Sequence, residues 1–242
     1  MGASMAAIST GTARGASDPG FISPQSPSGF DAGTMVAQPA KFLAAHGGVD
    51  PTAAACAPCV GAGCDQAHDS VDLKVRIRVP TNTSSFSFRH RLFTAEYPER
   101  LCASSNDFFV AMLTSSWVPG STPPNQPLPL DGNIAFDAQG HFMSVDSAAF
   151  DVCFPMAGAP PGSCPAGTVD LLGTGYGGAG NTLSDGAATS WLIADAPVVP
   201  GETIDLEFIV WDAQDHQGDA LVLLDRFRWG TPSVCGGPCP HP

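Results

Sequence analysis

The amino-acid sequence predicts an all-β protein: an antiparallel, jelly-roll-like β-sandwich with long Gly/Pro-rich loops and disulfides. Three observations support this class. Apolar and polar residues alternate with a period of two in several segments, as in strands that have one dry and one wet face. Glycine and proline (27 + 23) make up 50 of 242 residues, so turns are frequent. No segment has a convincing amphipathic helical pattern, whereas an apolar fraction of 43% is sufficient for a core.

About eight strands can be placed in order. In residues 71–79 (VDLKVRIRV) the apolar side chains alternate strictly with charged ones. Residues 86–93 (FSFRHRLF) alternate again, and His90 is expected on the core face as a hydrogen-bonded histidine. Residues 107–113 (DFFVAML) are apolar on both faces, which is typical of a central strand. The remaining predicted strands are 133–136 and 142–145 as a hairpin, then 150–154, 191–194, 204–211 and 221–229.

The chain is divided by composition into three parts. Residues 1–70 form a loop-rich segment that we assign to the same domain, residues 71–234 form the sandwich core, and residues 235–242 form a tail. The Pro-rich stretch 119–129 and the Gly-rich stretch 173–180 are predicted loops within the core.

The charge balance restricts the class of partner. Ten basic residues against 23 acidic ones leave a net charge of −13, which disfavours nucleic acid and anionic membrane surfaces and suits divalent cations. No apolar stretch is long enough for a transmembrane helix, and residues 1–20 lack the pattern of a signal peptide.

Eight cysteines, an even number, favour disulfides and an oxidising compartment, so we expect an extracellular protein. Cys153 and Cys164 bracket a loop, Cys235 and Cys239 can close the tail, and Cys102 is then left for one of the first three cysteines. These three are Cys56, Cys59 and Cys64. Together with His68 they also provide the three Cys and one His of a tetrahedral zinc site. The surrounding Ala, Pro and Gly and the expected export favour disulfides instead.

Several segments together resemble the choice-of-anchor L family of bacterial, especially myxobacterial, surface proteins. They are residues 8–13 (ISTGTA), 96–99 (EYPE), 105–110 (SNDFFV), 132–137 (GNIAFD), 150–153 (FDVC), 196–203 (APVVPGET), 211–215 (WDAQD) and 222–229 (VLLDRFRW). The resemblance covers nearly the whole chain and implies export, association with the bacterial cell surface and a β domain, but no particular ligand. The sequence departs from the family after Asp215, where it reads HQGDA instead of an Asp-Ser step, which weakens any role for Asp219.

Acidic residues at predicted strand ends suggest a Ca²⁺ site assembled from separate loops, because Ca²⁺ prefers hard oxygen ligands. The candidate ligands are Glu96, Asp107, Asp212, Asp215 and Asp225. Alternation places Asp225 with Leu221 and Leu223, toward the core, where a carboxylate needs a basic partner, hydrogen bonds or a cation. A salt bridge or a loop cap is the alternative for Asp225, and turns or caps are the alternative for the other acids.

Trp117 and Tyr176 lie in or beside loops and are candidate ligand-binding aromatics, with local loop packing as the alternative. The leading functional hypothesis is a non-catalytic extracellular adhesion or binding module, whose partner is a glycan or a surface protein. A second hypothesis is a structural subunit that self-associates into a surface assembly or filament by donating residues 1–70 as an edge strand. A third is a secreted carbohydrate-active hydrolase that uses Glu96 or Glu99 with an aspartate.

Overall fold

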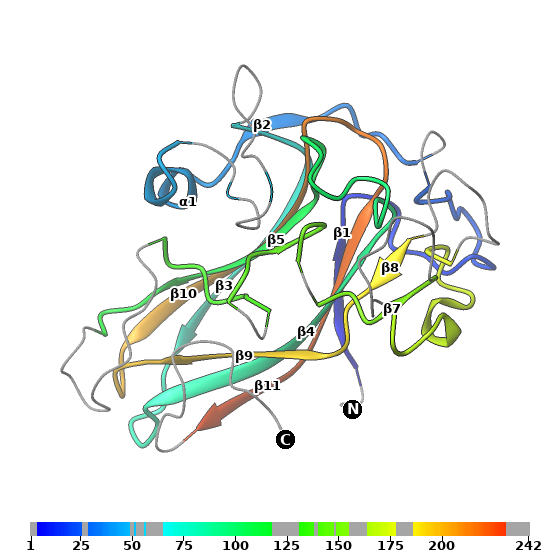
Figure 1. Ribbon diagram of the computed structural model, residues 1–242. Helices are drawn as coiled ribbons and strands as arrows, with labels where there is room; N and C mark the ends of the chain where they lie inside the picture. The colour runs from blue at the N-terminus through cyan, green and yellow to red at the C-terminus, as the bar shows by residue number, and fades with distance from the viewer. Residues whose placement is uncertain are drawn as a thin grey trace.

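The computed structural model describes residues 4–25, 29–48, 51, 56, 65–117, 131–137, 140–147, 149–154, 164–177 and 186–230. Its strands form two antiparallel sheets that pack face to face (Figure 1). The predicted all-β sandwich is therefore confirmed. No helix in this described part of the chain has the length and apolarity needed to cross a membrane.

The first sheet is built around two long strands that pair with each other. Its order is β1 (Ala6–Ser9), β11 (Ala220–Gly230), β4 (Ser85–Thr94), β8 (Ala187–Ala188) and β7 (Val152–Cys153), and β9 (Leu192–Pro197) also pairs with β4. The second sheet has the order β2 (Met35–Ala37), β3 (Gln66–Arg78), β10 (Thr203–Ala213), β5 (Phe108–Thr114) and β6 (Met143–Ser144). One α-helix, α1 (Ala40–Ala45), and one short 3₁₀ helix, η1 (Val169–Leu171), lie outside the sheets.

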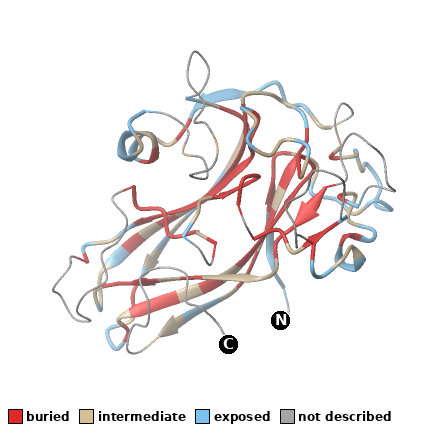
Figure 2. Cartoon of the chain, viewed as in Figure 1, coloured by how far each residue is buried: buried red, intermediate tan, exposed pale blue. Residues whose placement is uncertain are grey.

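The main core fills the space between the sheets, where the buried residues gather (Figure 2). The alternating strands supply it from one face each: Leu73 and Ile77 come from β3, whereas Phe88 and Leu92 come from β4. On β10 the alternation ends near Ile209, because both faces of its second half are covered. The outer face there packs against α1, since Phe42 contacts Phe108 and Trp211 at ring-centroid distances of 6.2 and 5.8 Å. The same cover explains why β5 is buried on both faces.

The N-terminal segment contains more regular structure than expected. Residues 6–9 form β1, which pairs with β11, and residues 35–37 form β2, which pairs with β3. Both are therefore strands of the sandwich within this chain. The hairpin expected from residues 133–145 is reduced to a single bridge between Phe136 and Phe142, and residues 143–144 pair with β5 instead.

The expected orientation of β11 is wrong. Val222 and Leu224 face the main core, whereas Leu221 and Leu223 face outward and pack beside Phe93 and Tyr176. The apolar run LVLLDRFRW supplies both faces, so alternation alone does not determine which one is inner. A register irregularity between Asp225 and Arg228 then interrupts the pairing with β4.

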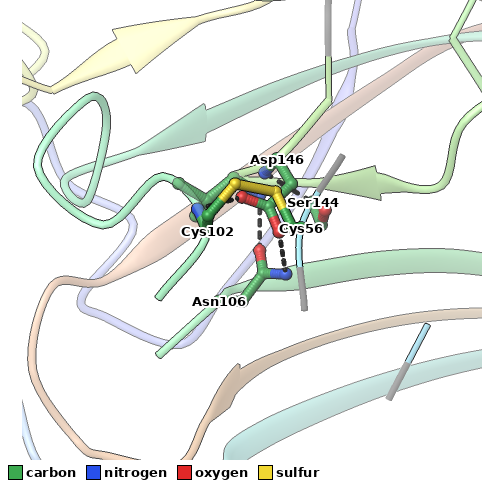
Figure 3. Close-up of a disulfide and its surroundings, with 6 residues drawn as sticks. Cys56, Cys102, Asn106, Ser144 and Asp146 are labelled. Atoms are coloured by element: carbon green, nitrogen blue, oxygen red, sulfur yellow. Dashed lines mark hydrogen bonds between the residues drawn. A yellow bond between two sulfur atoms is a disulfide. The ribbon is translucent and has the colours of Figure 1, made fainter. Parts of the chain in front are cut away.

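Two disulfides connect described residues, as the cysteine count predicts. Cys153 pairs with Cys164 across a loop, and Cys56 pairs with Cys102. Figure 3 shows Asp146 beside the second disulfide: its carboxylate accepts the Cys102 N–H at 2.7 Å and an Asn106 side-chain N–H at 3.1 Å. Because the Cys56 sulfur is in a disulfide, the zinc set that began at Cys56 is not formed. Cys59, Cys64, Cys235 and Cys239 lie outside the described residues.

Candidate metal centre

Strand ends from both sheets meet at one end of the sandwich, the upper end in Figure 1, where β10 turns into β11. The registers place them together: Ala220, which begins β11, is opposite Thr94, which ends β4. Similarly, Trp211 near the end of β10 is opposite Phe108 at the start of β5. Side chains that directly follow or precede these residues therefore converge. We refer to this region as the acidic end.

Four carboxylic acids at the acidic end are almost fully buried. They are Glu96, Asp107, Asp212 and Asp219, with relative exposures of 3%, 0%, 0% and 1%. Among the described residues, none of the four forms an ion pair with Lys, Arg or His. An acid in such a place is normally paired or hydrogen-bonded, because burying an isolated ionised carboxylate is costly.

Hydrogen bonds satisfy these acids only in part. Asp107 Oδ2 accepts the Thr94 hydroxyl at 2.9 Å, and Glu96 Oε2 accepts the Asp107 N–H at 3.3 Å. Asp219 Oδ2 accepts the Phe30 N–H at 3.3 Å. The second oxygen of each of these three acids is buried and has no hydrogen-bond partner in the described part of the chain.

Asp212 is the least satisfied of the four, because neither of its carboxylate oxygens has a hydrogen-bond partner among the described residues. The Thr10 hydroxyl lies near enough to lower the pKa of Asp212 somewhat, but it is not in hydrogen-bonding geometry with either oxygen. Instead that hydroxyl accepts the Ala220 N–H at 2.9 Å. Asp212 therefore presents two unused acceptor atoms in the interior.

Burial and repulsion between the carboxylates raise the pKa values of these acids, so they ionise only at a higher pH than exposed acids do. Burial, with Asp215 adding to it, raises the pKa of Glu96 to about 8. Burial raises the pKa of Asp107 well above its ordinary value, and Glu96 and Asp212 raise it further. Burial likewise raises the pKa of Asp212, and it raises the pKa of Asp219 to about 7. A neighbouring cation would reverse this effect by favouring the ionised forms.

Glycines allow the chain to come this close to the acids. A Cβ on Gly11 would lie 2.2 Å from Asp219 Oδ2, which is a steric clash, so the side chain or the backbone would have to move. Gly218 has a φ of +87°, and a Cβ there would lie 2.8 Å from Glu96 Cγ. Larger residues at these two positions would displace the carboxyl groups.

The structure brings together most of the predicted metal ligands. Glu96, Asp107 and Asp212 converge at the acidic end. Asp215 is half-buried beside them, where it accepts the Ser105 hydroxyl at 2.8 Å and the Gln217 N–H at 3.1 Å. Asp225 lies elsewhere: it pairs in register with Arg89, five residues along β11 from Ala220, or roughly 17 Å at the rise of a strand.

The environment of Asp225 is a separate apolar groove at the edge of the sandwich. The groove has a volume of about 450 Å³ and is lined by residues 4–6 and by β3, β4, β10 and β11, with Leu73, Phe88 and Phe208 among its apolar residues. Asp225 itself is 9% exposed and accepts the Arg226 N–H at 2.7 Å. Its surroundings are therefore mostly hydrocarbon, without the gathering of acids found around Asp212.

The exposure expected for the two candidate aromatics is wrong. Trp117 and Tyr176 are both 4% exposed, and Tyr176 packs against Phe93 with a centroid distance of 5.6 Å. Neither ring is therefore open for stacking on a sugar or a partner in this conformation. The local loop packing that was the alternative explanation describes both residues better.

Three further side chains form a second group of potential metal ligands. They are Asp31, Asp69 and His216. One ligand atom from each lies within 4.8 Å of the other two. The predicted site did not include these residues or Asp219. Asp219 precedes β11 just as Asp107 precedes β5, so the same strand-end argument predicts Asp219 as a ligand. The positions of Asp31 and Asp69 depend on the pairing of β2 with β3, which no local pattern indicates.

Comparisons with known proteins add no relative: no protein-family model, curated protein or solved structure matches the chain. The resemblance to choice-of-anchor L proteins therefore stays a prediction.

Proposed function

We propose that this protein is a non-catalytic binding or adhesion module of the bacterial cell surface or the extracellular space, whose acidic end is held together by Ca²⁺. Asp212 is the observation that carries the proposal. It is fully buried, it has no hydrogen-bond partner for either oxygen among the described residues, and three further buried acids surround it. The site therefore offers negative charge and acceptor atoms that the described residues leave unused.

A bound cation is the arrangement that best accounts for four buried acids without an ion pair. Without a cation, most of them must stay protonated, since close carboxylates cannot all ionise in a poorly solvated interior. The available atoms are oxygens, which suits Ca²⁺ with its roughly six to eight oxygen ligands. No three of these four acids have oxygens within 4.8 Å of one another, so main-chain carbonyls, hydroxyls or water must complete the ligand set.

The burial of these acids fits a structural role better than a catalytic one. The small cavity beside Asp219 has a volume of about 10 Å³, which is too small for a sugar ring, and it touches none of the other three acids. The hydrolase hypothesis paired Glu96 or Glu99 with an aspartate, but Glu96 is buried and Glu99 is exposed on the far side of a turn. These observations favour a structural role for the acids.

The two disulfides support an oxidising location, and the loops that the ion would order supply the binding surface for a glycan or a protein. Self-association by donation of residues 1–70 has less support, because β1 and β2 already pair with β11 and β3 of the same chain.

Thermal unfolding with and without calcium tests the proposal. We expect EDTA-treated protein to melt at a lower temperature and Ca²⁺ to restore it, since a ligand that binds only the native state stabilises it by mass action. At a hundredfold excess over Kd the gain is about 2.7 kcal/mol, or about 5–10 °C for a chain of this size.

Asp212→Asn and Asp225→Asn form a matched pair of variants for this test. Asp212→Asn should lose the calcium response without a lower melting temperature in EDTA, because an uncharged amide replaces a carboxyl group that stays protonated when no cation is bound. Asp225→Asn should keep the response of the natural protein, because Asp225 lies outside the acidic end. A natural protein whose melting temperature is insensitive to both EDTA and Ca²⁺ would contradict the proposal.

A further inference from the structure

We propose that the protein has a second metal site, of imidazole and carboxylate ligands, in which Asp31, Asp69 and His216 bind an ion of the Zn²⁺ class. This site goes beyond the proposed function: it uses different residues, takes a different kind of ion and does not depend on calcium at the buried acids.

The two separations from His216 Nδ1 to the carboxylate oxygens are close to those between ligands of a single small ion, and all three atoms lie within 4.8 Å of one another. His216 Nδ1 lies 3.3 Å from Asp31 Oδ1 and 3.8 Å from Asp69 Oδ2. Ligands bound to Zn²⁺ at about 2.0–2.1 Å in a tetrahedral arrangement lie about 3.3 Å apart. The observed atoms are therefore near the spacing that zinc would impose.

An ordinary His–Asp hydrogen bond does not explain this arrangement. A charge-assisted N–H···O bond is normally about 2.7–2.9 Å long, whereas both distances at His216 are longer. His216 Nδ1 is buried, and it is not in hydrogen-bonding geometry with either carboxylate. By contrast, His141 Nδ1 and Asp137 Oδ2 form such a bond at 3.0 Å. The His216 nitrogen instead lies between two carboxylates without bonding to either.

The loop of residues 31–34 holds both carboxylates in place. Asp69 Oδ2 accepts the Ala32 N–H at 3.0 Å, and Asp69 Oδ1 accepts the main-chain N–H and the hydroxyl of Thr34 at 3.1 and 3.0 Å. Asp31 Oδ1 accepts the Gly33 N–H at 2.6 Å. Asp69 Oδ2 and Asp31 Oδ1, the two oxygens nearest His216 Nδ1, each accept one of these hydrogen bonds and so retain a lone pair for an ion. Outer hydrogen bonds of this kind orient metal ligands before the ion arrives.

A second histidine provides an independent indication of a ligand. His68 is 8% exposed, and its Nδ1 is buried with no hydrogen-bond partner among the described residues. Its ring packs edge-on against the His216 ring at a centroid distance of 4.1 Å. His68 does not share the 4.8 Å spacing of the three ligand atoms, so we assign it to orienting His216 and leave the fourth ligand position to water.

The imidazole decides the class of ion. Ca²⁺ and Mg²⁺ take oxygen ligands, whereas Zn²⁺ is commonly bound by histidine nitrogen together with aspartate oxygen. The site is also open to solvent, because the Asp31 and His216 side chains are 57% and 33% exposed. An ion can therefore enter without unfolding the loop.

Metal titration of tag-free, metal-stripped protein tests the inference. We expect Zn²⁺ to bind in calorimetry with one ion at this site, and Co²⁺ to bind there with a visible absorption band. His216→Ala and Asp31→Asn should each weaken Zn²⁺ binding by at least about a hundredfold. His141→Ala is the control, because it removes a histidine of similar exposure that also contacts an aspartate.

The outcomes separate this inference from the calcium proposal. His216→Ala should retain the calcium-dependent rise in melting temperature, and Asp212→Asn should retain Zn²⁺ affinity within about threefold. Failure of Zn²⁺ to bind the natural protein, or Zn²⁺ affinity in His216→Ala equal to that of His141→Ala, would overturn the zinc site while leaving the calcium response unaffected.

Discussion

The acidic side chains in the two halves of β10 have opposite environments. In the first half, Asp205 and Glu207 lie on the outer face and pair with Arg76 and Lys74 of the neighbouring strand β3. In the second half, Asp212 is fully buried and neither of its oxygens has a hydrogen-bond partner among the described residues. The difference shows that acids on one strand can have separate roles: the first pair is compensated within the sheet, whereas Asp212 requires a cation or a proton.

The pKa values of these residues differ according to whether a basic partner neutralises the carboxylate. Hydrogen bonding to Arg76 lowers the pKa of Asp205, whereas burial raises the pKa of Asp212. A substitution at either end of β10 should therefore have a different consequence for stability and for metal binding.

Crowding the acidic end should have the largest effect. Gly11→Ala places a Cβ 2.2 Å from Asp219 Oδ2, so the carboxylate or the backbone must move. We expect a loss of about 3 kcal/mol in the free energy of unfolding, the upper part of the range for overpacking, together with a weaker calcium response. Denaturant unfolding with and without Ca²⁺ measures both. Gly15→Ala is the control, since Gly15 lies in the same N-terminal segment and its Cβ would lie 3.2 Å from Oδ2 of the exposed Asp18 side chain, which can move aside.

A buried histidine away from the acids should make the free energy of unfolding depend on pH. His90 lies in the core between Phe88 and Phe109, and burial lowers its pKa to about 3. Because the folded-state pKa lies below the unfolded value of about 6.5, this residue stabilises the fold fully above pH 6.5, and that stability is lost as pH falls. By pH 5 the loss is about 2 kcal/mol.

His90→Leu should remove this pH dependence. We expect the free energy of unfolding of the variant to exceed that of the natural protein by about 2 kcal/mol more at pH 5 than at pH 7, measured in denaturant. The raised pKa values of Glu96 and Asp219 act with the opposite sign, but they are common to both proteins and cancel in the difference. Parallel pH profiles for the two proteins would show that His90 is not held neutral.

The paired acids should have the smallest effect. Asp205→Asn removes the exposed ion pair with Arg76, and solvent and salt screen exposed pairs of this kind strongly. We expect a small loss of stability that shrinks further at high salt, measured in denaturant, and an unchanged calcium response. A calcium response that disappears in this variant would mean that charge anywhere on β10, rather than the buried acids, is responsible.

Sequence patterns were sufficient for the sandwich but not for all of its elements. Strict alternation identified β3 and β4 with their inner faces, because each has charged residues on the other face. In β11 both faces are apolar, so the pattern identified the strand but assigned the wrong face to the core. The strands and helix of residues 1–70 are three to six residues long, and they are formed by pairing and packing with distant residues.

The candidate site was predictable where it depends on strand ends. Glu96, Asp107 and Asp212 each lie beside a strongly patterned strand, so their convergence followed from the fold class. Asp31 and His216 come from loops whose position is set by tertiary contacts, and no local pattern places them. Asp225 lies five residues along β11 from Ala220, away from the strand ends where the other acids meet, so the strand-end argument does not apply to it.

Calorimetric titration of Ca²⁺ into metal-free protein at pH 7.5 measures whether the acidic end binds calcium. The natural protein and Asp225→Asn should bind at least one Ca²⁺ per chain with equal affinity, and Asp212→Asn should show no binding under the same conditions. If the natural protein binds no Ca²⁺, or if Asp212→Asn binds it with the affinity of the natural protein, the acidic end is not a calcium site.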